Sequence, residues 1–345
     1  MNQKPPTALS YSRILALISR FGLDPFVVAL LGAIVLAKLW PEPGIQEGVF
    51  SLSELAGYGV LAVFFLYGLR LDPQKLAAGF RNWKLHLVIH FVTFLLFPLL
   101  GLAGYTIFSS AGTAVIWLGI FYLSALPSTV SSSVVMVSIA GGNIPAAIFN
   151  ASISSLIGVF ITPLWVGLVL SASQEGFDLG PIILKLMLQI LLPVILGLLL
   201  HSRFGKMAER HKSKLRLFDQ SIILIIIYTS FSGSFSRNLF QDFSFQDIAL
   251  LSGGILAFFL LVLAAIYFGT RWLKFTREDT ITAMFCGTQK SLVQGTIMAK
   301  VLFAGAGFTG IVLLPVMIYH ALQLIVTSFI AGKMARNLVA PQEKR

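Results

Sequence analysis

The sequence predicts an all-α membrane protein with ten transmembrane helices. Three observations support this prediction: a strongly apolar composition, long apolar segments that recur along the chain, and positive charges in alternate loops between them. Apolar residues make up 57% of the 345 residues and charged residues 11%, with a mean hydropathy of +0.87. Because a soluble domain carries about 25% charged residues, most of this chain must face lipid or other apolar helices.

Ten apolar segments are long enough to cross a hydrocarbon core of about 30 Å at about 1.5 Å per helical residue. The expected helices are 24–40, 52–70, 85–108, 111–140, 143–171, 181–202, 217–236, 246–270, 279–304 and 307–332. The fourth is longer than a straight span needs, which favours an interruption within it. The count places both chain ends on the same side of the membrane.

Positive charges alternate between the two sides of these segments. Twenty of the 25 Lys and Arg residues fall in loops and span ends on one side, and only Arg237 and Lys300 fall on the other. Lys38, Lys185 and Lys290 lie deeper within segments. Because positive loops stay in the cytoplasm during insertion, we expect a multi-pass inner-membrane protein with both termini cytoplasmic. The net charge of +11 then indicates anionic lipid, not nucleic acid, as the partner.

The segments divide into two halves at the acidic loop 173–180. Five segments precede this loop and five follow it, so the second half must have inverted topology. Transporters are often built this way, with substrate sites near the midplane where helices are interrupted at matching positions. We therefore predict one polytopic unit, residues 1–345, built as an inverted five-plus-five repeat with broken, crossing fourth and ninth helices.

The fourth segment contains Pro127 in its middle, followed at once by a cluster of hydroxyl side chains. Proline removes a backbone donor and clashes with the preceding turn, and irregular backbone at this depth requires protein or water around it. A single serine in a membrane helix usually bonds the preceding turn, but this density of hydroxyls favours a binding site. The cluster consists of Ser128, Thr129, Ser131, Ser132 and Ser133.

The ninth segment has a comparable interruption. Gly287 is a helix breaker, and the polar residues Thr288, Gln289, Lys290 and Ser291 follow it. A helix broken at the midplane directs N–H groups of its second half and carbonyl groups of its first half into the site, which favour anions and cations respectively. Both interruptions are therefore expected to meet at a substrate or ion site.

Lys290 is the most informative single residue because it lies near the centre of a membrane segment. A lysine at that depth costs about 2.5–3.5 kcal/mol on insertion scales, and its ammonium cannot easily reach either interface. Three roles stay open: a counter-ion for an anionic substrate, a group that exchanges a proton, or a structural cap on carbonyl groups of the broken fourth helix. A carrier role requires both helices to be interrupted and the ammonium to face an opening.

Further polar side chains within the segments complete the candidate site. His90, Asn150 and Gln294 are included, and Gln294 lies one helical turn after Lys290 on the same face. Each could instead be an ordinary interhelical hydrogen bonder, as could His320 in the tenth segment. The substrate- or ion-binding candidates are Ser131, Ser132, Ser133, Asn150, Thr288, Gln289, Lys290, Ser291, Gln294 and His90, with Pro127 and Gly287 as the helix-breaking positions.

The sequence lacks the usual patterns of an enzyme. It has no Cys, His and carboxylate cluster at metal-ligand spacing and no nucleotide-binding fingerprint. The apolar segments offer almost no carboxylate for a Ser–His–Asp triad. We therefore expect a secondary transporter without catalytic residues and without a cofactor, sodium being the one candidate ion.

Five stretches spread over most of the chain carry a family resemblance. They are VFFLYGLRLDPQKL (63–76), KLHLVIHFVTFLLFP (84–98), LPSTVSSSVVMVSIAGGNIPAAIFNASISSLIGVFITP (126–163), CGTQKSLVQGTIMAKVLFAG (286–305) and LPVMIYHALQLI (314–325). The chain resembles the bile acid:sodium symporter superfamily, in particular its SBF-like branch, which includes the seventh vertebrate solute carrier 10 member and bacterial relatives. The resemblance implies a core of approximately 85–171 and 246–332 and a panel of approximately 24–70 and 181–236, with substrate bound between these moving parts.

In the better-known symporters of that superfamily, polar groups of the fourth and fifth segments and a Glu and a Gln of the ninth hold sodium. Carried over, the resemblance implies a sodium site at Ser132, Ser133 and Gln289. The Glu position falls near Phe285, so the carboxylate is missing, and Lys290 lies beside the Gln. An ammonium in place of the carboxylate–sodium pair would make transport sodium-independent or proton-linked.

The sequence therefore predicts a secondary active transporter that moves a small organic anion by alternating access. Two alternatives stay open. The first is a non-transporting membrane regulator, for example of calcium entry through a partner. The second is a cation/proton antiporter, which would normally need a buried carboxylate near the crossing. No pattern in the sequence indicates an oligomeric state.

Overall fold

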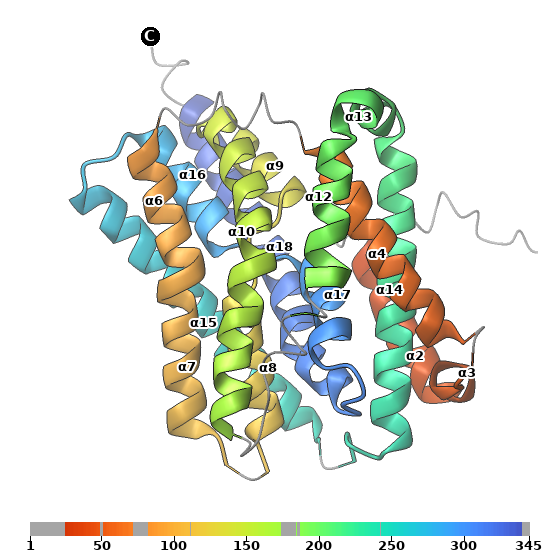
Figure 1. The fold of residues 1–345 in the computed structure, drawn as a ribbon. Helices are drawn as coiled ribbons and strands as arrows, with labels where there is room; N and C mark the ends of the chain where they lie inside the picture. Colours follow the sequence, from red (N-terminus) through yellow and green to blue (C-terminus); the bar gives the residue numbers. More distant parts are fainter. Residues whose placement is uncertain are drawn as a thin grey trace, which may run out of the picture.

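The computed structural model describes residues 25–48, 51–71, 82–110, 112–173, 184, 187–241 and 243–339. Every regular element among these residues is a helix (Figure 1), and none of them lies in a strand. Within the described residues, six helices are long and apolar enough to cross a membrane. They are Leu52–Arg70, Trp83–Phe108, Ile144–Leu170, Lys212–Ser236, Phe245–Trp272 and Thr309–Arg336. The chain is thus an all-helical, multi-pass membrane protein, as predicted.

Where the structure describes it, each predicted segment coincides with a helix or with consecutive helices; residues 181–183 and 185–186 of the sixth segment, with Lys185, lie outside the described residues. In the first half these are α2 (Pro25–Leu39), α3 (Glu42–Ile45), α4 (Leu52–Arg70), α6 (Trp83–Phe91), the π-helical turn η2 (Val92–Leu96), α7 (Phe97–Phe108), α8 (Ala114–Ala125), α9 (Ser131–Ala140) and α10 (Ile144–Ser173). In the second half they are η3 (Met187–Leu191), α12 (Leu192–Leu199), α13 (His201–Arg210), α14 (Lys212–Ser236), α15 (Phe245–Trp272), α16 (Arg277–Thr288), α17 (Leu292–Leu302) and α18 (Thr309–Val339). The count of ten spans and their inverted relation stay predictions.

The predicted breaks in the fourth and ninth segments are confirmed. Pro127 lies in the extended backbone that separates α8 from α9, and residues 289–291 separate α16 from α17. The two breaks touch, because the Ser291 N–H donates to the Pro127 carbonyl at 2.9 Å. The expectation for Gly287 is wrong: this residue is helical within α16. A Cβ there would lie 2.8 Å from Ile266 Cδ1, so the glycine permits close packing on α15 and does not break the helix.

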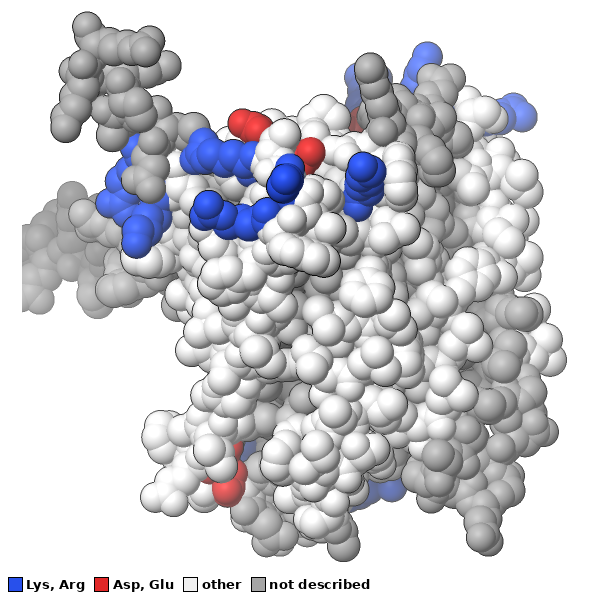
Figure 2. Space-filling model, turned by 90° about the vertical axis from the view of Figure 1, so that its left-hand side faces the viewer, with Lys and Arg blue, Asp and Glu red and all other residues white. Residues whose placement is uncertain are grey.

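The sixth predicted segment ends in a sharp bend. The chain turns by 95° between Leu188–Leu199 and α13, and α13 then lies across one end of the bundle (Figure 1). Residues His201–Arg210, which follow the sixth predicted segment, are therefore helical. We call the end of the molecule at which α13 lies the basic end, since most of the visible Lys and Arg side chains gather there in Figure 2. Lys38, expected deeper in a segment, lies exposed in the last turn of α2, towards the opposite end.

Helix contacts fall into two groups. In the first group α4 packs on α12 and α14, and α14 packs on α2; in the second, α8 and α9 pack on α18, α7 on α8, and α15 on α16. Helix α14 also contacts α17 and α18, which joins the groups (Figure 1). The first group holds the helices expected for the panel and the second those expected for the core. That the two groups move against each other stays a prediction.

Two glycines allow α4 and α12 to pack backbone against backbone. A Cβ at Gly68 would lie 2.1 Å from the Val194 carbonyl oxygen, and a Cβ at Gly197 would lie 2.1 Å from the Phe65 carbonyl oxygen. Small residues favour helix association in membranes because they let backbones approach closely. This contact therefore fixes the separation of α4 and α12.

The substitution Gly68→Ala is expected to lower the free energy of unfolding by about 1–3 kcal/mol, the usual cost of overpacking. Gly57→Ala on the same helix is the matched control, because a Cβ at Gly57 would meet nothing within 4 Å. Since Ala is the better helix former by about 1 kcal/mol, this control should be neutral or stabilising. Thermal unfolding in detergent compares the two, and equal melting temperatures would contradict the close packing.

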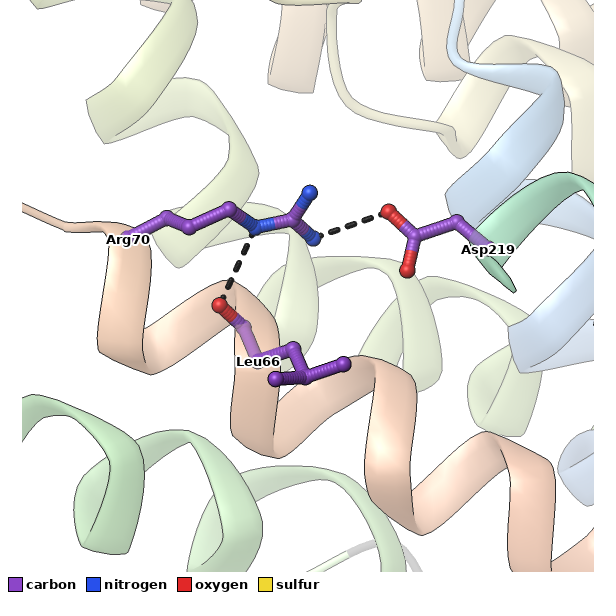
Figure 3. Close-up of polar contacts among 3 residues, drawn as sticks. All are labelled: Leu66, Arg70 and Asp219. Carbon is purple, nitrogen blue, oxygen red and sulfur yellow. Dashed lines mark hydrogen bonds and ion pairs between the residues drawn. The ribbon is translucent and has the colours of Figure 1, made fainter. Parts of the chain in front are cut away.

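An ion pair joins α4 to α14 near the basic end (Figure 3). Arg70 Nη2 donates to Asp219 Oδ2 at 2.9 Å, and Arg70 Nε donates to the Leu66 carbonyl at 3.0 Å. The two side chains are only 25% and 12% exposed. The other Asp219 carboxylate oxygen is buried with no hydrogen-bond partner among the described residues. The carboxylate thus depends on the guanidinium for its stability.

Replacing Arg70 with Met is expected to destabilise the protein by about 1–3 kcal/mol, because it leaves a mostly buried carboxylate without its counter-charge. Adding Asp219→Asn to this variant should recover part of the loss, since a neutral amide is less costly to bury. A double-mutant cycle by thermal unfolding measures the coupling. Melting temperatures that simply add would show that the pair contributes nothing.

Candidate functional site

The Lys290 ammonium is held in a cage of backbone carbonyl groups. Its Nζ donates to the carbonyl oxygens of Thr93 at 3.1 Å, Ser124 at 2.7 Å and Leu126 at 2.8 Å. It also lies 4.3 Å from the centroid of the Phe97 ring, where the face of an aromatic ring attracts a cation. An ammonium has three N–H donors, so all of them are used within the protein.

The Thr93 carbonyl is free to accept because Pro98 has no backbone N–H. In the π-helical turn η2 the Phe97 N–H donates to the Val92 carbonyl, so the carbonyls of Thr93 and Phe94 have no donor one turn further on. Lys290 takes the first of these carbonyls, and Trp165 Nε1 of α10 donates to the second at 2.9 Å. Pro98 thus leaves the carbonyls of Thr93 and Phe94 available as acceptors for Lys290 and Trp165.

The other two carbonyls of the cage belong to the end of α8. A helix leaves its last four carbonyls without intrahelical partners, and Pro127 prevents continuation. The Lys290 ammonium donates to the carbonyls of Ser124 and Leu126. The Thr162 hydroxyl donates to the Ala125 carbonyl at 2.7 Å, and the Ser291 N–H donates to the Pro127 carbonyl. The broken end of α8 is therefore satisfied chiefly by residues of the opposite break.

Helix α18 holds the backbone of the ninth-segment break. The Gln323 side chain accepts from the Lys290 N–H at 2.8 Å and donates to the Lys290 carbonyl at 2.9 Å. Gln323 Nε2 also lies 3.0 Å from His320 Nδ1, and the Tyr319 hydroxyl donates to the Thr288 carbonyl at 2.6 Å. Three neighbouring side chains of one helix thus support residues 288–290.

Gln289 joins the two polar clusters that the sequence identified. Its Oε1 accepts from the hydroxyls of Thr129 at 2.8 Å, Ser132 at 2.6 Å and Ser133 at 3.0 Å. Thr129 and Ser132 are also hydrogen-bonded to each other. The three residues that the resemblance implied as sodium ligands therefore lie together, and all their contributing atoms are neutral oxygens. Among the described residues, no group of three or more His, Cys, Asp or Glu side chains could hold a metal ion.

Of the remaining predicted residues, Ser291 and Gln294 bond the ends or neighbours of their helices, and Thr288 and Asn150 bond carbonyls of their own helices. Ser291 caps α17 by accepting from the Gln294 N–H at 3.3 Å, and Gln294 Nε2 donates to the Ser155 carbonyl at 3.4 Å. The Thr288 hydroxyl bonds its own helix at Met284, as the Asn150 amide does at Ala146. Asn150 Oδ1 and Gln294 Oε1 are buried acceptors with no donor in the described part of the chain.

Two predicted residues are not joined to this cluster. The structure shows no hydrogen bond to either ring nitrogen of His90 from any described residue, and its ring stacks with Phe94 at 6.1 Å. The sequence offered no preference for His320 over His90. In the structure, His320 contacts Gln323, which in turn holds the Lys290 backbone. Ser131 is the first residue of α9, and its side chain lies outside the described residues.

The ammonium does not face an opening in this conformation. Lys290 is only 1% exposed. It lines neither the apolar cavity of about 600 Å³ between α7, α8 and α15 nor the smaller cavity of about 160 Å³ beside Arg237. Of the two features expected if Lys290 acts in a carrier, the breaks are present and the exposed ammonium is not, so Lys290 is not positioned to contact a substrate in this conformation. Of the three open roles, the carbonyl cap is the one that this geometry fits.

Sequence reasoning missed several members of the site. The carbonyls of Thr93 and Ser124 carry no side-chain signal, although Pro98 could have indicated freed acceptors in the third segment. Gln323 was not among the predicted substrate- or ion-binding residues. The aromatic partners Phe97 and Tyr319 were not considered, and nothing in their spacing separates them from other buried aromatic residues.

Comparison with known proteins agrees with this architecture. The family model described as "SBF-like CPA transporter family" matches residues 24–336. The chain belongs to this family. It is therefore a membrane transporter and not an enzyme. Both helix breaks and all the contacts of Lys290 lie within the matched residues.

Relatives of similar length support the membership. An uncharacterized protein of Pseudomonas aeruginosa is 42% identical, covering 92% of this chain and 95% of the relative. YfeH of Escherichia coli, which carries the name of a symporter, is 35% identical over 93% and 96% of the two chains. Sodium/bile acid cotransporter 7 of Rattus norvegicus is 31% identical over 95% and 97%. A small-molecule substrate follows from this membership.

The carbonyl cage predicts the effect of removing the ammonium. In Lys290→Met three buried carbonyls lose their donor, at about 1–3 kcal/mol each, while relief from burying a cation returns about 2.5–3.5 kcal/mol. Together these ranges give a net change between about −0.5 and about 6.5 kcal/mol, with a midpoint of about 3 kcal/mol, so we expect destabilisation, seen as a lower melting temperature in detergent. The exposed Lys84 is the matched control, and Lys84→Met should change stability by less than about 0.5 kcal/mol. Equal melting of both variants would refute the cage.

Proposed function

We propose that this protein is a secondary active transporter of a small organic anion in the inner membrane, with both termini in the cytoplasm. In this proposal Lys290 takes over the role of the sodium ion of related symporters, although its ammonium donates to the carbonyls of Thr93, Ser124 and Leu126 and not to Ser132, Ser133 or Gln289. The observation that carries it is the carbonyl cage: three backbone oxygens and one ring face surround the ammonium where the two breaks meet. Transport is then sodium-independent or linked to protons.

Backbone carbonyls are the groups that replace the hydration shell of a cation inside a membrane. The cage therefore has the chemistry of a cation site whose cation is covalently attached. The missing ninth-segment carboxylate fits this view. A free sodium ion would need that negative charge, whereas a lysine beside neutral Gln289 brings its own cation and needs only dipoles.

The anion preference follows from the dipoles at the crossing. The second halves of both broken segments, α9 and α17, begin there, and helix N-termini favour negative charge. The ammonium contributes positive potential without direct contact, because its donors are occupied. Substrate would then bind between the core and panel groups and be exposed alternately by their relative movement, as in transporters of inverted repeats.

The test is uptake into liposomes that contain the purified protein, with radiolabelled cholate as the first probe, because one relative is named a sodium/bile acid cotransporter. We expect uptake to be the same in sodium and in choline buffers, and to change only with a pH gradient if protons are coupled. Uptake that a sodium jump drives, without any pH effect, would refute the lysine replacement.

The Lys290→Ala variant provides a second test of whether the carbonyl cage is a cation site. Shortening the side chain leaves the three carbonyls open to a free cation, so this variant should lose transport in choline and regain part of it with sodium or with a small primary amine such as ethylamine. Sodium should also raise its melting temperature but not that of the unaltered protein. If sodium affects both proteins equally, the cage is not a cation site.

The alternatives make different predictions in the same assay. A folded protein that transports neither cholate nor any other anion of a broad panel would favour the membrane regulator. The antiporter alternative lacks its carboxylate, because no described residue of either break is acidic. Proton-coupled cation flux without anion flux would nevertheless support it.

A further inference from the structure

A small cavity lies at the end opposite to the basic end, and none of its described lining residues belongs to the site at Lys290. Its volume is about 160 Å³, and residues of α3, α4, α14 and α17 and of the turn before α18 enclose it. The polar residues of the lining are Ser53, Thr229, Ser230, Arg237, Lys300 and Thr309. The described lining therefore holds two cations and four hydroxyl groups, and no carboxylate.

The two cations are among the few described basic residues at this end of the molecule, where Lys38 is exposed as well. Arg237 and Lys300 are the basic residues that the sequence places in loops and span ends away from the cytoplasm, against twenty on the cytoplasmic side. The positive-inside rule makes such residues unusual there. That both of them line one cavity indicates that their charge is used together.

Arg237 has the geometry of a guanidinium available for a ligand. It directly follows α14, where its backbone N–H donates to the Phe235 carbonyl, and no described residue forms a hydrogen bond or ion pair with its exposed side chain. A Cβ on Gly307 would lie 2.3 Å from the guanidinium Cζ, so the glycine is what allows this group to lie against the turn before α18. The Ser234 hydroxyl donates to the Gly307 carbonyl at 3.1 Å and ties that turn to α14.

Lys300 approaches the cavity from the other group of helices. It lies in the last turn of α17, and its Nζ donates to Ser53 Oγ on the first turn of α4 at 2.5 Å. Arg237 belongs to the end of α14, in the predicted panel, and Lys300 to the predicted core. The cavity therefore lies on the seam between the two groups that must separate if the transporter is to open at this end.

We propose that this cavity binds the anionic head group of the transported molecule, a carboxylate or a sulfate-type group, at the seam on the outer side. The proposal rests on the proposed function. A guanidinium presents a planar fork that matches carboxylate and sulfate oxygens. The cavity holds about five water volumes at about 30 Å³ each and is below the 300–1,000 Å³ of whole-ligand pockets, so it accepts a head group only.

An anion in this cavity also affects the conformation. An anion there would contact Arg237 of one helix group and Lys300 of the other at the same time. These contacts would stabilise the closed seam. Binding at this position would therefore help the protein close behind its substrate.

Anion-dependent thermal stabilisation tests the proposal on the full-length protein in nanodiscs of phosphatidylcholine, so that no anionic lipid competes. Cholate and inorganic sulfate are the probes, with chloride at matched ionic strength as the reference. Arg237→Gln and Lys300→Gln should each raise the half-effective anion concentration at least tenfold, as expected for the loss of a charge-assisted hydrogen bond. Lys38→Gln is the matched control, since Lys38 is exposed towards the same end and outside the cavity, and it should have no effect.

A second measurement does not depend on variants that fold. Phenylglyoxal, which modifies arginine, should label Arg237 in the unaltered protein, and cholate or sulfate should slow that labelling at concentrations that stabilise the protein. Labelling that neither anion slows would overturn the proposal.

The outcomes separate this inference from the proposed function. If anions stabilise the unaltered protein and both Gln variants equally, the head-group site is wrong while anion transport stands. If no anion stabilises the unaltered protein and none is taken up by liposomes, both proposals fail. If only nanodiscs with phosphatidylglycerol stabilise the protein, through Arg237 and Lys300, the cavity holds a lipid headgroup and the proposal is overturned.

Discussion

The structure depends on one constraint: backbone groups released by a helix break inside a membrane must find their partners in the protein. No water is available in the hydrocarbon core to satisfy them, and each unsatisfied group costs several kcal/mol. The break after α8 and the π-helical turn in the third segment together expose more carbonyls than their own helices can serve. The Lys290 ammonium donates hydrogen bonds to three of these carbonyls at once, because it has three N–H donors and no acceptor.

Two prolines create this demand in different segments. Pro98 withholds an N–H from the third segment and Pro127 ends α8, and the freed carbonyls of both converge on the same ammonium. This explains how a lysine can be fully buried among apolar helices without an ion pair to any acidic side chain that the structure describes. Its desolvation is offset by carbonyl dipoles and a ring face and not by a counter-charge. The same carbonyls would be costly to bury without it, so the lysine and the two breaks stabilise one another.

The sequence predicted the positions of the helix breaks better than the hydrogen bonds that satisfy the backbone groups released there. Charge alternation and segment length located the helices, and proline followed by hydroxyls located the first break. Gly287 was misjudged because a glycine can serve close packing as well as helix termination, and only the position of Ile266 decides between them. A cap on carbonyls of the broken fourth helix was one of the three roles left open for Lys290, but the sequence could neither select that role nor identify Thr93 of the third segment, because the acceptors are backbone atoms. Gln289 was identified by residue type, yet its role as a common acceptor for three hydroxyls depends on how two breaks meet.

A tethered cation changes what can drive transport. A sodium ion that enters with the substrate is released on the other side and transfers the energy of its own gradient, whereas in the proposed cycle Lys290 would return unchanged and transfer none. Without proton exchange, the substrate would then move only down its own electrochemical gradient. For a monovalent anion, a potential of 100 mV, negative inside, contributes about 2.3 kcal/mol towards the outside. Under the proposed replacement, secondary active uptake of an anion against that potential would therefore require proton coupling.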